Sequence, residues 1–198
     1  QVMRAVCQGL APLAQAQRPL AVSIAAGITT TQMQRWLGGG VAVVRSMPNT
    51  PALLGAGVTG LYASDEVDDA GRQRTALLLS AAGPTVWIDA EAKMDAVTGV
   101  SGSGPAYVFL LVEAMAAAGA KLGLTPEMAM QLARATVSGS GELLRQSSEP
   151  AAQLRINVTS PGGTTAEALK VLMADDGIQP VFDKALAAAS RRSKELAG

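Results

Sequence analysis

The segment whose residues are best suited to ligand binding or catalysis is 158–167, which reads Val-Thr-Ser-Pro-Gly-Gly-Thr-Thr-Ala-Glu. Thr164 and Glu167 have the S/T-x-x-E spacing of a capping box, so we expect Thr164 to cap a helix that begins here. Glycines beside a helix start expose backbone N–H groups, which suit a carboxylate or a phosphate. Thr165 falls one residue inside that helix, where capping does not require its hydroxyl. A ligand role and a structural role therefore fit Thr165 equally well.

Two further segments follow predicted strands. Met-Pro-Asn-Thr-Pro at 47–51 comes directly after a β-branched run, and Ile-Ala-Ala-Gly at 24–27 leaves the end of another. Ligands of open α/β sheets bind outside the carboxyl ends of strands. The two prolines hold Asn49 and Thr50 in a stiff turn that can present polar groups. On local sequence, a plain turn at 47–51 and tight packing at 24–27 remain equally acceptable interpretations.

Other candidate groups are less specific. Glu91 and Asp95 are spaced i, i+4 on one predicted helical face, as a paired carboxylate site requires, although solvated helix charges are commoner. Tyr62 and Tyr107 carry hydroxyls that can donate protons, but tyrosines more often pack with a satisfied hydroxyl. No G-x-G-x-x-G sequence follows a predicted strand, so the usual phosphate-binding turn of a dinucleotide site is not found.

The composition excludes several kinds of chemistry. The 198 residues include no histidine and a single cysteine, Cys7. A histidine triad, a zinc site, a thiolate cluster and a disulfide framework are therefore excluded. Sixteen basic and sixteen acidic side chains balance, which predicts no nucleic-acid partner. The apolar run at 114–120 is too short to span a membrane, so we expect a soluble cytoplasmic protein.

Strand and helix patterns alternate in the first part of the chain. This alternation predicts a parallel, doubly wound sheet with α/β architecture. The predicted strands are residues 20–24, 41–46, 58–63 and 84–88, and the predicted helices are residues 1–16, 31–37 and 65–82.

Strand patterns stop after Asp89 and alanine-rich helical patterns follow. We place a domain boundary near residue 90, which gives an α/β domain at 1–90 and an all-α domain at 91–198. Small residues bury little area each, so we expect the helical domain to complete its core against a second copy. The predicted helices are residues 91–99, 105–122, 126–147, 150–157, 165–174 and 178–196.

Four segments together resemble the pyrroline-5-carboxylate reductase family in order and spacing. They are Ser-Ile-Ala-Ala-Gly-Ile-Thr at 23–29, Met-Pro-Asn-Thr-Pro at 47–51, Asp-Ala-Val-Thr-Gly-Val-Ser-Gly-Ser-Gly-Pro-Ala-Tyr at 95–107 and Val-Thr-Ser-Pro-Gly-Gly-Thr-Thr at 158–165. The resemblance spans nearly the whole chain. It departs from the family at the front, where the first strands and the glycine-rich loop of the family are missing.

The resemblance implies reduction of 1-pyrroline-5-carboxylate to L-proline with NADPH or NADH. It implies the C-terminal portion of a Rossmann-like NAD(P)-binding domain, followed by a helical dimerisation and substrate-binding domain. The protein would be a homodimer, with further assembly of dimers into a ring.

The resemblance also assigns residues to the site. Thr165 would hydrogen-bond the ring nitrogen of the substrate as the catalytic group, and no metal is involved. A protonated imine is already an electrophile, so an active site without histidine is no obstacle. The implied cofactor contacts are Ile24, Ala25, Ala26, Pro48, Asn49, Thr50 and Asn157, and the implied substrate contacts are Glu91, Gly162, Gly163, Thr164 and Thr165.

Two alternatives stay open at this point. A 3-hydroxy acid dehydrogenase would rely on a catalytic lysine by resemblance, and the matching helix segment offers Lys93 without that family's glycine-rich pattern. A non-catalytic helical assembly module would remain if the cofactor half had been lost. The coding sequence upstream of Gln1 would distinguish a truncated reductase from such a module.

Overall fold

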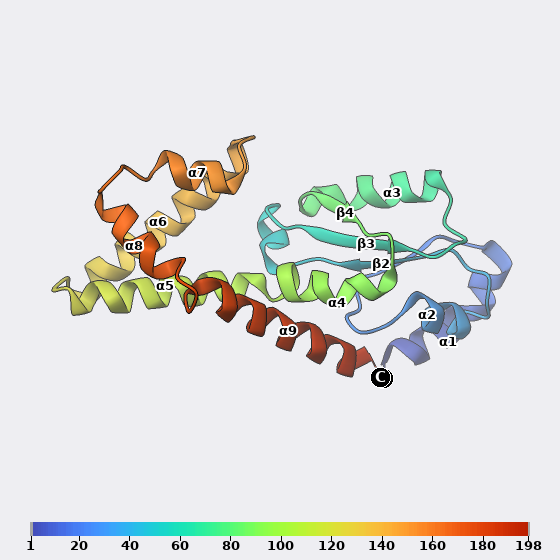
Figure 1. The fold of residues 1–198 in the computed structure, drawn as a ribbon. Helices are drawn as coiled ribbons and strands as arrows, with labels where there is room; N and C mark the ends of the chain where they lie inside the picture. The colour runs from blue at the N-terminus through green and yellow to red at the C-terminus, as the bar shows by residue number, and fades with distance from the viewer. Residues whose placement is uncertain (1, 198) are drawn as a thin grey trace. The chain divides into compact units, whose positions relative to one another are not determined.

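The computed structural model describes residues 2–197, drawn in Figure 1. The chain forms two compact units. One contains the residues up to Pro105 together with the C-terminal stretch from Leu186, and the other is Ala106–Ala185. The first unit holds every described strand, and the second is entirely helical. An α/β portion followed by a helical portion is the predicted fold class.

The first unit is built on a four-stranded sheet with the spatial order β1-β2-β3-β4. Its strands are β1 (Ala21–Ser23), β2 (Val43–Met47), β3 (Thr59–Ala63) and β4 (Thr85–Trp87). The pairs β1–β2 and β3–β4 are parallel, whereas β2–β3 is antiparallel. All four predicted strands are confirmed, but the sheet is mixed rather than wholly parallel.

The antiparallel pair has a local cause. Residues 48–58 connect β2 to β3, and this is shorter than the dozen or more residues that a parallel crossover requires. A short 3₁₀ helix, η1 (Thr50–Leu54), ends at Gly55 with a φ of 66°. The backbone N–H of Val58 then donates to the side-chain oxygen of Asn49 at 2.9 Å. The chain therefore reverses and returns beside the strand it has just left.

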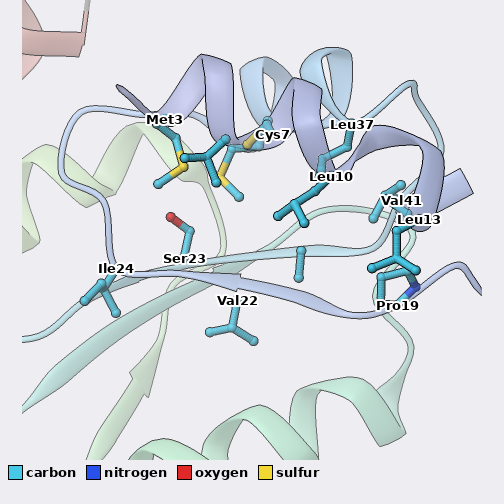
Figure 2. A pocket seen from close by; sticks show the side chains of 14 residues that line it. Met3, Cys7, Leu10, Leu13, Pro19, Val22, Ser23, Ile24, Leu37 and Val41 are labelled. Carbon is cyan, nitrogen blue, oxygen red and sulfur yellow. The ribbon is translucent and has the colours of Figure 1, made fainter. Parts of the chain in front are cut away.

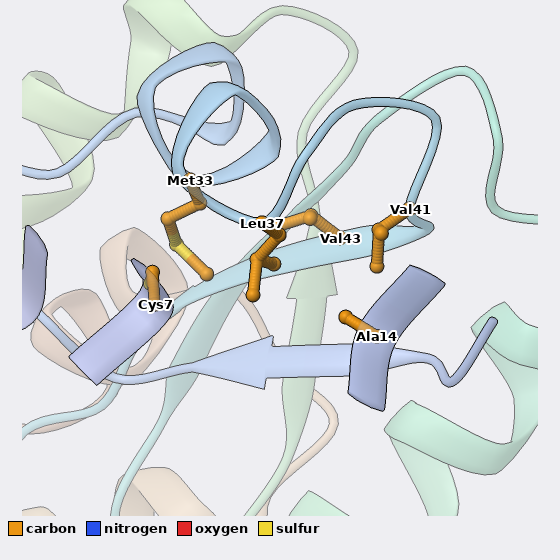
Figure 3. Close-up of a cluster of buried hydrophobic side chains, with 6 residues drawn as sticks. All are labelled: Cys7, Ala14, Met33, Leu37, Val41 and Val43. Carbon is orange, nitrogen blue, oxygen red and sulfur yellow. The ribbon is translucent and has the colours of Figure 1, made fainter. Parts of the chain in front are cut away.

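Helices cover both faces of this sheet because neighbouring strand residues point to opposite sides. Val43 belongs to a cluster formed with α1 (Val2–Gln17) and α2 (Thr30–Trp36), which Figure 3 shows. Val44 belongs to a separate cluster, against which Leu79 of α3 (Asp69–Leu79) packs. The first cluster is Cys7, Ala14, Met33, Leu37, Val41 and Val43, and the second is Val44, Leu61, Ala63 and Val67.

The start of α3 differs from the prediction that a helix opens at residue 65. Asp68 is the N-cap, and its carboxylate accepts from the N–H of Gly71 at 2.7 Å. The preceding residues form a turn, in which the N–H of Val67 donates to the carbonyl of Ser64 at 3.0 Å and the Ser64 hydroxyl donates to Glu66 at 2.7 Å. The helix therefore begins only at Asp69, and it continues into η2 (Ser80–Ala82).

A helical segment of changing pitch follows β4. It consists of η3 (Glu91–Lys93), α4 (Met94–Val97) and the π-helical η4 (Thr98–Gly102). Gly102 lies against the end of β2, because a Cβ at this residue would lie 2.8 Å from Cε of Met47. The segment is thereby held against the carboxyl end of β2.

The helices of the second unit have a small core. They are α5 (Gly104–Lys121), α6 (Pro126–Gln146), α7 (Ala151–Asn157), α8 (Thr164–Leu172) and the first part of α9 (Ile178–Ala197). The predicted cap is confirmed at α6, where the Thr125 hydroxyl accepts from the N–H of Met128. The buried cluster of this unit is Ala116, Ala129 and Ala133, whereas Phe109 and Leu110 are 61% and 62% exposed. Its large apolar side chains are thus largely uncovered within one chain.

Candidate functional site

The carboxyl ends of β1 and β2 form one edge of the sheet. The strands run parallel with Ser23 opposite Arg45, and the hydroxyl of Ser46 donates to the carbonyl of Ser23 at 2.8 Å. Residues 24–26 and 48–50 leave the sheet directly after these strands. The structure therefore brings the two strand-end segments predicted to border the cofactor, Ile24-Ala25-Ala26 and Pro48-Asn49-Thr50, to the same edge.

The two segments differ in what they expose. The Ile24 side chain is 68% exposed, and the N–H of Ala25 donates to the Ser23 hydroxyl at 3.1 Å, which shapes the turn after β1. Gly27 completes that turn with a φ of 75°. Asn49 uses its side-chain oxygen to close the β2–β3 reversal, so this oxygen has the structural role that the turn interpretation proposed.

Glu91 lies in a network that joins three elements. Its Oε1 accepts from the N–H of Thr30 at 2.8 Å and from Nη1 of Arg45 at 3.3 Å, and its Oε2 accepts from the Thr30 hydroxyl at 2.8 Å. Thr30 is the first residue of α2, and Arg45 lies inside β2. The Arg45 side chain is 6% exposed and that of Glu91 is 19% exposed, so the ion pair is largely withdrawn from solvent.

Glu91 and Asp95 do not form a paired carboxylate site. Asp95 instead accepts from the Ser193 hydroxyl at 2.7 Å, which ties α4 to the end of α9. The two carboxylates have separate partners because the chain between them passes from the 3₁₀ turn η3 into α4, not along one helix. Neither carboxylate is a solvated helix charge. The assignment of Glu91 to substrate stays a prediction.

The sequence Ser-Pro-Gly-Gly at 160–163 forms a tight turn before α8. The N–H of Gly163 donates to the carbonyl of Ser160 at 3.0 Å, and Gly162 has a φ of 68°. Proline followed by a glycine of positive φ is the pattern of a type II turn. The N–H of Gly163 is consequently used within the turn and is not available to an anion.

The predicted capping box at α8 is wrong. Gly163 is the N-cap and provides no side chain, so Thr164 is the first helical residue and not the cap. The turn delivers Gly163 in an extended conformation, which shifts the helix start one residue toward the N-terminus. Glu167 pairs with Lys170 at 2.6 Å rather than reaching back to the cap.

This arrangement leaves donors at the start of α8. The N–H groups of Thr164, Thr165 and Ala166 belong to the first helical turn, where no carbonyl of the same helix can accept from them. They lie at the positive end of the helix dipole, which favours an anion. The half-buried Thr165 adds a hydroxyl in the same turn. The turn can hold a carboxylate and offer one neutral hydrogen-bonding group beside it.

Asn157 takes part in a local network. Its Nδ2 donates to Glu149 at 2.9 Å, and its Oδ1 accepts from Nε2 of Gln153 at 2.8 Å. The network lies in the second unit, which also contains the 160–163 turn. Sequence inspection missed Glu149, which belongs to no motif. It also missed Arg45 and Thr30, although an arginine within a buried β-branched strand was a usable signal.

The remaining candidate residues, Tyr107, Tyr62 and Lys93, lie outside the strand-end segments and the turn before α8. Tyr107 packs edge-on against Phe182, with ring centroids 6.1 Å apart. Tyr62 is half-buried in β3. Lys93 pairs with Asp89 at 2.6 Å, and both side chains are more than half exposed. Among the described residues, no group of three or more acidic, cysteine or histidine side chains is placed to hold a metal ion.

An apolar cavity of about 440 Å³ lies between α1 and β1 (Figure 2). Met3, Val6 and Leu10 of α1 line it on one side, and Val22 and Ile24 line it on the other. The Cys7 thiol also faces it, and burial raises the pKa of that thiol, so the group is protonated and unreactive near neutral pH. The cavity has no charged lining residue.

One helical stretch, residues 91–121, is long and apolar enough to cross a membrane by length and composition alone. It is not one regular helix, because the π-helical turn Thr98–Gly102 interrupts it and Pro105 follows. Of the 18 consecutive residues that are most apolar in this stretch, only 6% are buried within the chain. Those side chains require another apolar environment.

Comparisons with known proteins match both the C-terminal region and the whole chain to one family of enzymes. A family model described as pyrroline-5-carboxylate reductase dimerisation matches residues 91–196. A pyrroline-5-carboxylate reductase from Pseudomonas aeruginosa is 51% identical over 197 residues, which cover the whole of this chain and 71% of that protein. One from Pasteurella multocida is 40% identical, with 99% of this chain and 71% of the relative covered.

Solved structures agree with these sequence matches. A pyrroline-5-carboxylate reductase from Coxiella burnetii superimposes with a TM-score of 0.94 and 40% identity, covering 99% of this chain and 72% of that one. The Plasmodium falciparum pyrroline carboxylate reductase, solved with NADP bound, superimposes with a TM-score of 0.81 and 31% identity, covering 98% and 73%.

Proposed function

Because the chain belongs to the pyrroline-5-carboxylate reductase family, we propose that it catalyses the NAD(P)H-dependent reduction of 1-pyrroline-5-carboxylate to L-proline, the final step of proline synthesis. The observation that carries this proposal is 51% identity to a reductase of that name over the whole chain. The protein is thus an oxidoreductase that acts on a carbon–nitrogen double bond.

The proposed cofactor site lies at the edge formed by the carboxyl ends of β1 and β2. The residues there fit a dinucleotide, since Ala25 and Ala26 are small, and Gly27 at a φ of 75° lets the backbone turn sharply. NADP in the Plasmodium falciparum relative supports the choice of cofactor. When bound, the reduced nicotinamide supplies a hydride. Ile24, Ala25 and Ala26 would lie along the cofactor, and Pro48, Asn49 and Thr50 would border its nicotinamide. The assignment of Asn157 to the cofactor stays a prediction.

The proposed substrate site is the turn before α8. N–H groups of the first helical turn would hold the substrate carboxylate, since Gly163 donates within the turn and leaves Thr164, Thr165 and Ala166 as the available donors. The Thr165 hydroxyl would accept from the N–H of the protonated imine and so fix the ring. No strong acid is required, because the iminium carbon is already electrophilic. Gly162 would contribute to the substrate site by forming the turn, which its positive φ of 68° permits.

The proposed assembly is a cytoplasmic homodimer formed through the helical domain, with dimers arranged in a ring. The exposed apolar side chains of α5 and α6 support this, because the matched family region is described as a dimerisation domain. We assign the apolar stretch 91–121 to this dimer contact and not to a membrane.

The reverse reaction offers a test of the proposed function. The full-length protein should reduce NADP⁺ in the presence of L-proline, followed by absorbance of the reduced nicotinamide. D-Proline is a matched control with the same groups in the opposite configuration. No proline-dependent reduction by folded, dimeric protein would contradict the proposal.

A further inference from the structure

The carboxylate of Glu91 ties together the two segments that leave the cofactor edge of the sheet. One bond partner, Thr30, opens α2 immediately after the turn formed by residues 24–29. The other, Arg45, lies two residues before Met47, where β2 ends and the 48–50 segment begins. The bridge of Thr30, Glu91 and Arg45 is therefore connected by short stretches of chain to both segments.

The bridge places charged and polar groups where apolar side chains could pack equally well. Thr30 and Arg45 are 4% and 5% exposed, and the strand that carries Arg45 is otherwise largely apolar. A buried arginine is tolerated only with a charge partner and hydrogen bonds, and an apolar residue is often at least as stabilising in its place. The charged bridge thus defines a geometry that an apolar contact would leave looser.

The geometry also argues against Glu91 as a substrate contact. A carboxylate has about four lone-pair positions. Three are taken by Thr30 N–H, the Thr30 hydroxyl and Arg45 Nη1. The Glu91 carboxylate is therefore occupied mainly by hydrogen bonds within the protein.

We propose that Glu91 is a positioning residue, which acts through Thr30 and Arg45 to set the two cofactor-side segments, and is not a ligand of the substrate. This inference rests on the proposed function for the identity of the cofactor. Disturbing the bridge weakens binding of the nicotinamide cofactor and leaves the affinity for the imine unchanged.

Thr30→Val tests the bridge with little change of shape. This variant keeps the backbone N–H and removes the hydroxyl that donates to Glu91. In the full-length protein we expect the KM for NADPH to rise about tenfold, with kcat and the KM for the imine within about twofold of wild type. Thr30→Ser keeps a hydroxyl and should restore the KM for NADPH. A folded Thr30→Val protein with a wild-type KM for NADPH would overturn the inference.

A second variant removes the charges together. Arg45→Met combined with Glu91→Gln leaves no unpaired buried charge, so it avoids the folding defect expected of either change alone. It should raise the KM for NADPH. Asp89→Asn, an exposed carboxylate two residues before Glu91, is the control and should change nothing. If the double variant raised only the KM for the imine, Glu91 would be a substrate contact and the positioning role would be refuted.

Direct binding keeps this inference separate from the reaction. NADPH fluorescence titration measures the dissociation constant without turnover. If wild-type protein binds NADPH but does not reduce the imine, the proposed function fails, and the titration of Thr30→Val still decides the bridge. Equal dissociation constants for wild type and Thr30→Val would refute it, and a rise of about tenfold would support it.

Discussion

Thr165 is the residue on which the proposed chemistry depends most. It lies in the first turn of α8, half-buried, beside N–H groups that have no acceptor within the helix. Its neighbour Thr164 is not the cap that sequence spacing suggested, because Gly163 takes that position. Neither threonine is therefore needed to start the helix.

Thr165→Ala should lower kcat by about one to three decades, the range expected for a positioned proton-relay or orienting group. Thr165→Ser retains the hydroxyl and should keep most of the activity. Steady-state kinetics with both substrates varied would measure the change. A Thr165→Ala protein with wild-type kcat would remove the hydroxyl from the mechanism.

Glu66 provides a test of pH dependence. Hydrogen bonds, the largest from the Ser64 hydroxyl, lower the pKa of this carboxyl below its ordinary value of 4.5. A lowered folded-state pKa means that the charged form stabilises the fold above the unfolded pKa, and that this contribution is lost as pH falls through the folded pKa. Gln34 of α2 also donates to Glu66, so the contact joins α2 to the turn after β3.

Glu66→Gln should therefore lower the free energy of unfolding at pH 7 by less than about 1 kcal/mol, since the group is exposed. The difference from wild type should shrink below pH 4.5. Urea unfolding at pH 7 and at pH 3 would measure it. A difference that grows on acidification would show that the sign is wrong.

At the scale of elements, Gly57 and Gly83 hold together the two segments that lead into the parallel strands β3 and β4. The N–H of Gly57 donates to the carbonyl of Ala82 at 3.0 Å. Gly83 has a φ of 128°, and a Cβ there would lie 1.9 Å from the carbonyl oxygen of Gly57. Neither the backbone conformation nor the space accepts a side chain at Gly83.

Gly83→Ala should destabilise the protein by about 3 kcal/mol or more, because it combines a backbone strain with a clash against main chain. Gly9→Ala is the matched control. Gly9 lies within α1, where an added Cβ would meet nothing within 4 Å, so alanine there should stabilise by about 0.5–1 kcal/mol. Thermal or urea unfolding would compare the two. Equal effects at both glycines would contradict the packing around Gly83.

Most elements could be predicted from the sequence, because each carries its own local signal. The β-branched runs marked β1 and β2, and the Thr-Pro pair at 125–126 marked the start of α6. What failed depended on the competition of two local signals or on the length of a connection. At α8 the proline–glycine turn overrode the capping box, and at β3 the short return forced an antiparallel pair.

The site divides in the same way. The strand-end segments and the glycine turn carry local signals, so their places in the chain could be predicted, and their roles in binding stay predictions. The Thr30–Glu91–Arg45 bridge joins residues 61 and 46 positions apart, so its members carried no common motif. The spacing of Glu91 and Asp95 suggested a pair, whereas long-range partners give the two carboxylates separate roles.

At the scale of the whole molecule, the second unit has too little core for its length. Its buried cluster consists of alanines, while leucines and a phenylalanine of α5 remain exposed. The match of residues 91–196 to a dimerisation domain supports the burial of these side chains against a second copy. We therefore expect association with a second copy to contribute to the stability of this unit.

Light scattering at micromolar concentration should give at least twice the mass of one chain. Phe109→Asp, at a side chain 61% exposed on α5, should shift the protein toward monomer and lower its melting temperature. Leu77→Asp alters a side chain 78% exposed on α3, outside the matched dimerisation region, and should leave the mass unchanged. A monomeric wild-type protein would contradict this account of the helical unit.

The most direct test of the central claim follows the hydride itself. NADPH deuterated at C4 of the nicotinamide, on one face and then on the other, is incubated with 1-pyrroline-5-carboxylate and the full-length protein, and the proline formed is analysed by mass spectrometry. The account predicts L-proline with one deuterium at C5 from one labelled face and none from the other. Unlabelled proline from both faces, or no proline, would contradict it.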